Sequence, residues 1–378
     1  MAEEHPEQAL ELRSLVTEAG TVELSLAEVD VPIPAEGEVV VRVEAAPINP
    51  SDLGLLLAGA DVSSALASGT AERPVVSVPL DSGATRAAAA RLGQEMTVGN
   101  EGAGRVVAAG DGDAAQALLG KLVAVAGGGM YAQSRCVPAA ACLVLPDGTS
   151  AAQGAAAFVN PMTALAMVET MRAEGHTGLV HTAAASNLGQ MLNRICLEDG
   201  VPLVNVVRSP AQADLLRAAG AAHVCDSSSE TFMDDLTAAL RATSATLAFD
   251  AVGGGTLASR ILTAMEVALT SGAAFSRYGS TVHKQVYLYG SLDRGPTELR
   301  RSYGMAWGVG GWLLTPFLIA AGSEKVEAMR QRVAAGLTTT FASRFSDTVS
   351  LAGALDPEAL ADYSRMGTGR KYLVTPNG

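Results

Sequence analysis

One segment of the sequence constrains the fold of this chain more than any other. Residues 178–208 read GLVHTAAASNLGQMLNRICLEDGVPLVNVVR. A short apolar run opens the segment, and apolar residues then recur at helical spacing from Leu188 to Ile195 before Gly200. A second apolar run, at 201–207, is typical of a buried strand in a parallel sheet. The segment therefore predicts a strand, a tight turn, a helix and a second strand, which is the outline of a βαβ unit.

The turn of this unit carries an altered form of a dinucleotide-binding pattern. Where G-x-G-x-x-G places three glycines, the chain has Ala184, Ser186 and Gly189. Small side chains still let a pyrophosphate approach the helix N-terminus, where free N–H groups and the helix dipole favour an anion. Ser186 either adds a hydroxyl to this cradle or only caps the helix. We therefore predict a cofactor site formed by Ala184, Ser186, Asn187, Leu188 and Gly189.

The end of the second strand bears on which nicotinamide cofactor binds. An acidic residue there would hold the ribose 2′-hydroxyl of NAD, whereas arginine suits the 2′-phosphate of NADP. The strand is followed by Arg208 and Ser209, and no acid occurs before Asp214. A guanidinium offers a planar fork for phosphate oxygens, and Ser209 could add a hydrogen bond. The pattern favours NADPH, with a solvated charge at a strand end as the alternative role of Arg208.

Composition and charge limit the classes of function. The chain has 378 residues, 48% of them hydrophobic, and 40 glycines, which suits two domains of α/β architecture. A net charge of −13 argues against a nucleic-acid-binding surface. Residues 1–14 are polar, unlike a signal peptide, and the apolar run 312–321 is too short to cross a bilayer. Four scattered cysteines are typical of reduced thiols. We expect a cytoplasmic protein that binds neither nucleic acid nor membrane.

The pattern of apolar and turn residues changes along the chain. Before Gly154, short alternating strands such as 38–45 and 104–109 lie between turn residues, which is typical of a barrel-like domain. The Ala-, Ser- and Gly-rich segment 58–98 predicts an insertion or a flap, with a helical pattern at 84–92. Beyond Gly154, helical and strand patterns alternate. Outside the βαβ unit, we expect helices over 155–171, 211–219 and 231–241, and strands over 223–225, 246–251 and 286–289.

The order of several short motifs points to a known family. INPSD at 48–52, GNEGAGRVVAAG at 99–110, NPMTAL at 160–165 and GRKYLV at 369–374 occur in sequence around the βαβ unit. This ordered set resembles the medium-chain dehydrogenase/reductase superfamily, and within it the zinc-free quinone oxidoreductases and enoyl thioester reductases. The resemblance extends from about residue 20 to the end of the chain.

The resemblance implies an α/β fold with two domains. A GroES-like, β-rich catalytic domain would comprise 1–158, with an insertion at 58–98, and 323–378. A Rossmann domain with a doubly wound parallel sheet would comprise 159–322 and bind NADP. NADPH would lie between the two domains.

The resemblance also bears on metal. Zinc alcohol dehydrogenases of this superfamily have a cysteine and a histidine where this chain has Asn49 and Asn100. Amide side chains are poor zinc ligands beside thiolate and imidazole, so we expect no zinc. Glu101 stands where the family often keeps an acid, and we expect a structural hydrogen bond or ion pair there.

Without a metal, the protein must supply orientation and a polar group for the oxyanion or enolate that develops as hydride moves from the cofactor. The resemblance puts Asn49 beside the nicotinamide, and capping the turn before Pro50 is its alternative role. Enoyl thioester reductases carry a proton-donating tyrosine shortly after this motif, but residues 53–70 contain none. Among the tyrosines elsewhere, we choose Tyr289 as the candidate catalytic group.

Further positions are expected near the cofactor from the resemblance. Thr163 belongs to a region that family members use near the nicotinamide or pyrophosphate. Gly253 and Gly290 end strands where a glycine permits close backbone approach. Lys371 lies on the returning C-terminal strand, from which a basic residue often reaches the cofactor phosphates. Core or cap roles for Thr163 and a solvent-facing role for Lys371 are the alternatives.

Aromatic residues concentrate in one region. Residues 276–319 hold both tryptophans and four of the seven tyrosines of a chain that is only 4% aromatic. Such a concentration suggests a substrate-lining wall or a dimer contact. Met305, Trp307 and Trp312 are candidates to stack on a planar quinone or enone, with core packing as the alternative for each. We expect a homodimer that uses the strand around Tyr287.

Together these features predict an NADPH-dependent reductase of quinones or activated alkenes that acts on a small molecule without zinc. Two alternatives stay open. One is a non-catalytic NADPH-binding protein of the same fold, which the altered glycine pattern favours. The other is an enoyl thioester reductase that acts on acyl-CoA, for which Arg294, Arg300 and Arg301 could form a basic patch.

Overall fold

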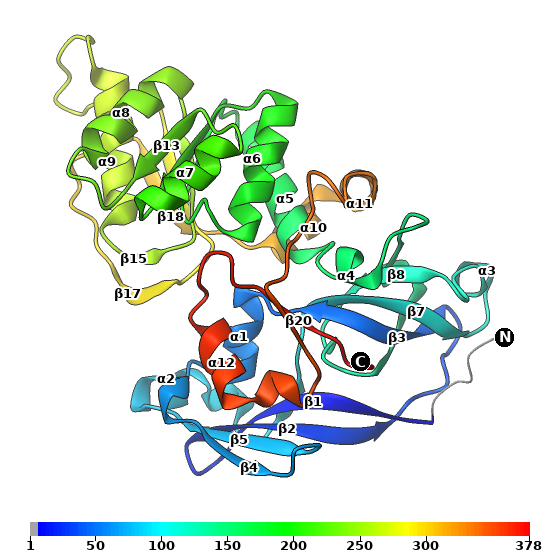
Figure 1. Cartoon of the computed structure of the whole chain (residues 1–378). Coiled ribbons are helices and arrows are strands. Elements are labelled where there is room, and N and C mark those ends of the chain that lie inside the picture. Colours follow the sequence, from blue (N-terminus) through cyan, green and yellow to red (C-terminus); the bar gives the residue numbers. More distant parts are fainter. Residues whose placement is uncertain (1–6) are drawn as a thin grey trace. The chain divides into compact units, whose positions relative to one another are not determined.

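The computed structural model describes residues 7–378, and the chain forms two compact units (Figure 1). The first unit runs to Val159 and resumes at Arg330, and the second comprises Asn160–Met329. The first boundary is one residue from the boundary expected from the motifs. The second boundary follows Met329 instead of Gly322 and falls inside helix α11 (Ser323–Ala335).

The first unit is built on two sheets. One has the strand order β4-β5-β2-β1-β6, and the other has the order β10-β8-β7-β3-β20-β19, with β9 also paired to β3. Alternate residues of β3 face opposite sides, so Val39 and Val41 enter the main core while Val40 packs in a smaller cluster. The strands are β1 (Gln8–Val16), β2 (Thr21–Asp30), β3 (Glu38–Pro47), β4 (Leu66–Gly69), β5 (Pro74–Pro79), β6 (Glu95–Thr97), β7 (Glu101–Ala109), β8 (Leu122–Ala126), β9 (Ser134–Pro138), β10 (Cys142–Val144), β19 (Asp347–Val349) and β20 (Tyr372–Val374).

Short helices connect these strands. Helix α1 begins at Pro50, where proline suits the first turn because its missing N–H needs no partner. Asn49 is its N-cap, and Asp52 accepts a hydrogen bond from the Asn49 backbone N–H at 2.7 Å. The helices of this unit are α1 (Pro50–Leu57), α2 (Ser82–Ala87), α3 (Asp113–Gln116), α4 (Ala151–Gly154) and α12 (Pro357–Ser364).

The segment 58–98 is part of the first sheet. Strand β5 pairs with β2, β4 pairs with β5, and β6 pairs with β1. The flap expected from composition is therefore wrong, because Val76 and Val78 of β5 are fully buried in the core. The helical pattern at 84–92 forms only the short helix α2 and one 3-10 turn.

The second unit is a parallel sheet of six strands in the order β13-β12-β11-β14-β16-β18. In chain order this is 3-2-1-4-5-6, the order of a doubly wound dinucleotide-binding sheet. The predicted α/β fold class is confirmed. The strands are β11 (Leu179–His181), β12 (Leu203–Val207), β13 (His223–Asp226), β14 (Leu247–Asp250), β16 (Lys284–Leu288) and β18 (Trp307–Gly311), and a separate pair is formed by β15 (Gly253–Gly255) and β17 (Asp293–Thr297).

The two faces of this sheet differ in chemistry. Val180, Ala248 and Val286 pack with helices α8 and α9 in a hydrophobic core. The residues next to them in β11 and β14, His181 and Phe249, belong to the opposite face because side chains alternate along a strand. The helices are α5 (Val159–Ala173), α6 (Asn187–Asp199), α7 (Pro210–Ala218), α8 (Phe232–Thr243), α9 (Leu257–Thr270) and α10 (Leu314–Ala321).

The dimer strand expected from sequence is not at an edge. Strand β16, which contains Tyr287, pairs with β14 on one side and β18 on the other. A strand paired on both sides has no backbone groups left for a second copy, so that part of the prediction is wrong. Over the part of the chain that the structure describes, the edge strands of this sheet are β13 and β18.

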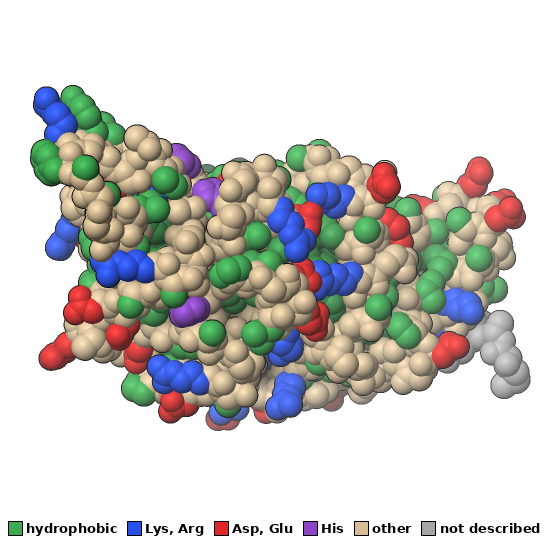
Figure 2. Space-filling view, turned by 90° about the horizontal axis from the view of Figure 1, so that it is seen from above, with side chains coloured by type: hydrophobic (Ala, Val, Ile, Leu, Met, Phe, Trp, Pro, Cys, Tyr) green, Lys and Arg blue, Asp and Glu red, His purple; other side chains and the backbone are tan. Residues whose placement is uncertain are grey.

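Two further features complete the description. The helical stretch Ala151–Ala173 is long and apolar enough to span a membrane, but 78% of its most apolar window is buried inside the structure. On the face shown in Figure 2, basic and acidic side chains are interspersed.

Candidate active site

The βαβ turn has the geometry of an anion cradle. Ser186 caps helix α6, and its hydroxyl accepts a hydrogen bond from the Gly189 N–H at 3.1 Å. A Cβ at Gly189 would overlap the carbonyl oxygen of Ala184, so the third glycine of the pattern is required for packing. Ala183 has φ of 50°, a left-handed conformation that alanine rarely adopts. Ser186 therefore serves as the cap, and the turn keeps the tight form that the glycines usually provide.

The residues after β12 are the ones that the NADPH hypothesis concerns. Arg208 is exposed, and its backbone N–H donates to the Gln212 side chain at 3.0 Å. Ser209 caps helix α7 by accepting from the Gln212 N–H at 3.4 Å. These bonds fix the backbone and leave the Arg208 side chain exposed at the end of the strand, next to the βαβ turn in the sheet order.

The loop after β14 is organised by a buried carboxylate. Asp250 is fully buried, and it accepts hydrogen bonds from the Thr182 hydroxyl at 2.6 Å and from the Val252 N–H at 2.9 Å. Gly253 has φ of 80°, and a Cβ at Gly290 would lie 2.6 Å from the carbonyl oxygen of Ala251. Both glycines are thus required by close contacts within the chain itself. Their predicted contact with a cofactor stays a prediction.

A second polar cluster lies in the first unit. The Asn49 side chain donates to Glu101 Oε1 at 2.8 Å, and its oxygen accepts from Lys371 Nζ at 3.0 Å. Asp52 accepts from the Asn100 N–H at 2.8 Å. Glu101 Oε2 accepts from the N–H groups of Phe158 and Val159, at 2.8 and 2.9 Å. The Glu101 carboxyl therefore makes the structural hydrogen bonds expected of it, and Asn49 joins that carboxyl to the ammonium of Lys371.

Burial changes the acidity of this cluster. Asn49, Asp52 and Glu101 are each at most 1% exposed. Burial raises the pKa of Asp52 to about 7, although the N–H groups of Asn49 and Asn100 oppose the rise. Burial also raises the pKa of Glu101, and it lowers the pKa of Lys371 against the attraction of Glu101. Three groups with perturbed pKa values at one place are typical of a functional site.

The cluster does not suit zinc. The Asn49 oxygen is bound to an ammonium, and the Asn100 side chain donates to the Ser51 hydroxyl at 3.0 Å. These residues supply two amides and two carboxylates, and none of them is a thiolate or an imidazole, the groups that zinc prefers. Within residues 7–378 no group of three or more His, Cys, Asp or Glu side chains is arranged to hold a metal.

The predicted phosphate contact of Lys371 has a competitor. Its ammonium bonds to Asn49 and lies 5.8 Å from the centre of the Phe345 ring. These contacts hold the Lys371 ammonium in the polar cluster of the first unit that contains Asn49 and Glu101. Thr163, by contrast, is 7% exposed near the start of helix α5, so a core role fits it as well as a cofactor role.

Tyr289, the candidate catalytic tyrosine, bonds to a histidine that sequence analysis missed. Its hydroxyl is 2.7 Å from Nε2 of His181, which is fully buried, and the two rings stack at 5.8 Å. Burial lowers the pKa of His181 to about 3, so this imidazole is neutral. Burial also raises the pKa of Tyr289 above its usual value. His181 is the last residue of β11 and Tyr289 follows β16, 108 residues later in the chain, so no local motif marks the pair.

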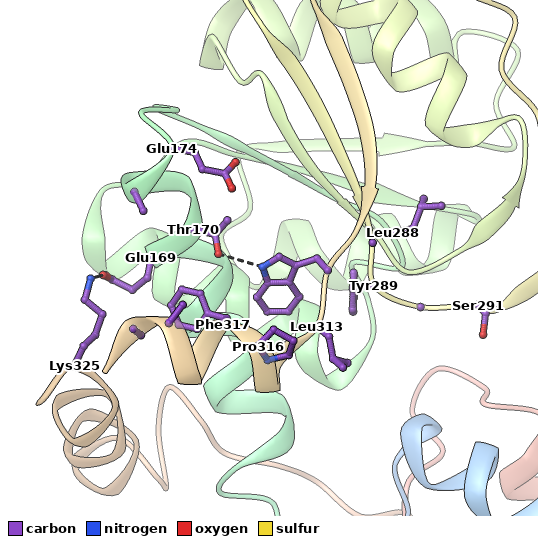
Figure 3. A pocket seen from close by; sticks show the side chains of 16 residues that line it. Glu169, Thr170, Glu174, Leu288, Tyr289, Ser291, Leu313, Pro316, Phe317 and Lys325 are labelled. Carbon is purple, nitrogen blue, oxygen red and sulfur yellow. Dashed lines mark hydrogen bonds and ion pairs between the residues drawn. The ribbon is translucent and has the colours of Figure 1, made fainter. Parts of the chain in front are cut away.

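A cavity of about 920 Å³ lies beside Tyr289 in the second unit (Figure 3). Of the three residues expected to line a substrate site, only Trp312 lines this cavity. Met305 is 74% exposed, and Trp307 packs edge-on against Tyr303 at the start of β18. Met305 and Trp307 were expected to line the substrate site, but they do not line this cavity, because they lie at the other end of β18 from Trp312. The lining is Glu169, Thr170, Ala173, Glu174, Leu288, Tyr289, Gly290, Ser291, Gly311, Trp312, Leu313, Pro316, Phe317, Ala320, Ala321 and Lys325.

Comparisons with known proteins find similar sequences and structures. Residues 35–147 match the alcohol dehydrogenase GroES-like domain. The synaptic vesicle membrane protein VAT-1 homolog of Rattus norvegicus is 28% identical over 144 residues, 37% of this chain and 35% of that protein. The chain thus matches about a third of the length of this curated relative.

Solved structures match over nearly the whole chain. A protein of Mesorhizobium loti, named as a candidate NADPH:quinone reductase, is 26% identical with a TM-score of 0.72, covering 99% of this chain and 100% of that one. The mycobacterial protein Rv1454c, solved in complex with NADPH, is 18% identical with a TM-score of 0.67, covering 97% and 100%. The GroES-like match, the doubly wound sheet and the similarity to the Mesorhizobium loti structure confirm the resemblance that the ordered motifs predicted, to the medium-chain dehydrogenase/reductase superfamily and its branch of quinone oxidoreductases and enoyl thioester reductases.

Proposed function

We propose that the protein is an NADPH-dependent oxidoreductase that reduces a quinone or an activated alkene without a metal. The observation that carries the proposal is Arg208, which follows the second strand of the doubly wound sheet, where the chain has no acid before Asp214 to hold an NAD ribose. The packing of Gly189 against Ala184 supports the cofactor site, because it keeps the helix N-terminus close to the turn. The structural similarity to an NADPH complex supports the same cofactor.

When bound, NADPH supplies a hydride, and reduction of a quinone needs one further proton from solvent. Arg208 would bind the 2′-phosphate, and the N-terminus of α6 would face the pyrophosphate. In the first unit, the Lys371 ammonium and the Asn49 amide form one hydrogen-bonded pair. We propose that this pair stabilises the negative oxygen that develops on the acceptor. Asn49 alone is a weaker candidate, because both ends of its amide are already engaged.

Turnover is the direct test. NADPH oxidation should be followed with a panel of neutral quinones, enones and acyl-CoA thioesters, before and after incubation with a chelator. We expect quinone or enone turnover that survives chelation. Turnover with acyl-CoA alone would favour the enoyl thioester reductase. Tight NADPH binding without turnover on any acceptor would favour the non-catalytic cofactor-binding protein.

The assembly and location follow the same proposal. We propose a homodimer that pairs through the free edge of β18, because the other edge of that strand is already bonded to β16. We also propose a cytoplasmic location, which the buried thiols of Cys142 and Cys225 support because they form no disulfide and reduced thiols are typical of that compartment.

A further inference from the structure

The proposed reaction needs a proton donor that the motifs do not supply. When a hydride adds to a quinone or an enone, the acceptor is left with a negative oxygen that must gain a proton. Residues 53–70 contain no tyrosine to provide it. The polar cluster of the first unit holds four other groups that exchange protons, the side chains of Asp52, Glu101, Tyr131 and Lys371. Their hydrogen bonds and their exposure show which of them is placed to give a proton to a bound molecule.

The two carboxyl groups of the cluster are fully used as acceptors. Asp52 accepts from the backbone N–H of Asn49 at 2.7 Å on one oxygen and from that of Asn100 at 2.8 Å on the other. Glu101 accepts from the Asn49 amide on one oxygen and from two backbone N–H groups on the other. Both side chains are at most 1% exposed. A buried carboxyl whose oxygens both face N–H groups is not placed to donate to a ligand.

The hydroxyl of Tyr131 is also committed. It donates to the Pro47 carbonyl at 3.0 Å, and the side chain is 1% exposed. A tyrosine hydroxyl has a single proton, so this bond leaves none for another acceptor.

Lys371 differs from these groups in both respects. An ammonium has three N–H donors, and within residues 7–378 that of Lys371 has one hydrogen-bond partner, the Asn49 oxygen at 3.0 Å. Lys371 is half-buried instead of fully buried, and its ammonium lies 5.8 Å from the centre of the Phe345 ring. The Lys371 ammonium therefore combines spare protons with access from the surface.

Glu101 and Asn49 hold this ammonium in place. The Glu101 carboxylate only accepts, so it takes the N–H side of the Asn49 amide and turns the amide oxygen toward Lys371. Glu101 is itself held by the backbone N–H groups of Phe158 and Val159. Asn49 and Glu101 are thus positioning residues that leave the remaining protons of Lys371 available.

The surroundings also bear on how readily Lys371 loses a proton. Burial lowers its pKa, and the charged groups that face it, Glu101 of β7 and Asp52 of α1, oppose that change. A proton donor is most effective when its pKa lies near the working pH, so a lowered pKa suits the role.

We propose that Lys371 is the proton donor of the reaction. As the hydride adds to the acceptor with its electron pair, one N–H bond of the ammonium breaks and an O–H bond forms on the acceptor oxygen. The acceptor is reduced to a hydroquinone or an enol, and NADPH is the species oxidised. Lys371 is left as a neutral amine and recovers a proton from solvent. The inference rests on the proposed reductase function, and it adds proton transfer to the stabilisation of the negative oxygen.

Arginine separates proton transfer from charge. Lys371→Arg keeps the positive charge, but a guanidinium does not lose its proton in proteins. We expect Lys371→Arg to lower kcat for a neutral quinone about 100-fold and to leave the Kd for NADPH within a factor of about two. Lys121→Arg, at an exposed lysine outside the cluster, is the matched control. Wild-type kcat in Lys371→Arg would overturn the inference, because charge alone would then be sufficient.

Small amines distinguish a lost proton donor from a damaged fold. Lys371→Ala removes the side chain, and added ethylamine should restore kcat in a saturable way. The same amine should have no effect on Lys371→Arg, whose side chain fills the space. If Lys371→Ala keeps the wild-type melting temperature and no primary amine raises its kcat, the inference is wrong.

The titration of Lys371 can be observed without cofactor or substrate. The chain has only four lysines, so carbon-13 labelling of lysine gives a simple NMR spectrum. The Cε resonance that disappears in Lys371→Met reports the titration of this side chain. Because the donor must be protonated, the wild-type kcat should fall as the pH rises through the midpoint of that titration. A kcat that stays constant through this pH would contradict the proposed role.

The two proposals can fail separately. Turnover that Tyr289→Phe abolishes and Lys371→Arg leaves unchanged would keep the reductase and make Tyr289 the donor. Unchanged kcat with weaker NADPH binding in Lys371→Arg would return Lys371 to a phosphate contact. No turnover by the wild type on any acceptor would remove the reductase and its proton donor together.

Discussion

Arg208 is the residue on which cofactor choice depends. Its side chain is exposed at the end of β12, and its backbone is fixed by Gln212. We predict that Arg208→Ala weakens NADPH binding by roughly 1.5–3 kcal/mol, about tenfold to a hundredfold, and leaves NADH unchanged. Titrations of tryptophan fluorescence with both nucleotides measure this. Arg217→Ala is the matched control, because Arg217 is an exposed arginine of the neighbouring helix that pairs with Asp214. An equal loss for NADPH and NADH would reject a 2′-phosphate contact.

Asp52 should make stability depend on pH. Its folded pKa, about 7, is above the unfolded value of about 3.8, so the native state binds more protons between these values. The resulting stabilisation is complete below about pH 4 and is lost as the pH rises through about 7. Asp52→Asn cannot ionise, so its free energy of unfolding relative to wild type should rise by on the order of 1–4 kcal/mol between pH 4 and pH 7. The melting temperature relative to wild type should rise over the same range, and thermal unfolding at each pH measures it. Asp214→Asn, an exposed carboxylate, is the control. A constant difference between Asp52→Asn and wild type across this range would contradict the prediction.

Residue-level predictability depends on the separation of partners along the chain. The Ser186 cap joins residues three apart, and local sequence rules find it. The His181–Tyr289 and Asn49–Lys371 contacts join residues 108 and 322 apart. Sequence patterns therefore selected Tyr289, Asn49 and Lys371 as candidates but could not give their partners. For Lys371, the contact within the first unit differs from the phosphate role that resemblance implied.

At the scale of elements, helix α6 packs closely against the turn before it because Gly189 has no side chain. A Cβ there would overlap the backbone of Ala184. We predict that Gly189→Ala destabilises the protein by about 1–3 kcal/mol and weakens NADPH binding, because helix and turn must separate. Gly54→Ala in helix α1 is the control, since nothing lies within 4 Å of the added Cβ. Thermal unfolding and NADPH titration of both variants measure the effect, and equal stability of the two would show that the turn is not tightly packed.

Element boundaries were predictable where the signals are local. The helix before Gly200 ends there, with Gly200 at φ of 65°, and the buried strands β12 and β14 lie in mainly apolar runs. Helix α5 was expected from 155 but begins at Val159. The N–H groups of Phe158 and Val159 are taken by Glu101, more than fifty residues earlier in the chain. No local pattern contains that contact, and the same holds for the pairing of β5 and β6 into the first sheet.

At the scale of the whole molecule, the motif order was enough to predict two units and the class of each. It could not give the sheet edge, because strand order depends on the path of the whole chain. Tyr287 belongs to a typical strand pattern, yet that strand is interior and β18 is the edge. The glycine-rich pattern of β18, WGVGG, gives little strand signal.

The edge of β18 allows a sharp test of the proposed dimer. The Trp312 N–H donates to Leu288 of β16, and the Ala306 carbonyl accepts from Lys284 of β16. Because backbone groups alternate sides along a strand, those of Gly310 also face β16, and those of Val309 face the free edge. We predict that Val309→Pro keeps the fold and produces a monomer, since proline removes only the outward N–H. Gly310→Pro should instead lower the melting temperature, because it removes a hydrogen bond within the sheet. Light scattering measures the mass of each variant, and a Val309→Pro protein that stays dimeric would place the dimer contact elsewhere.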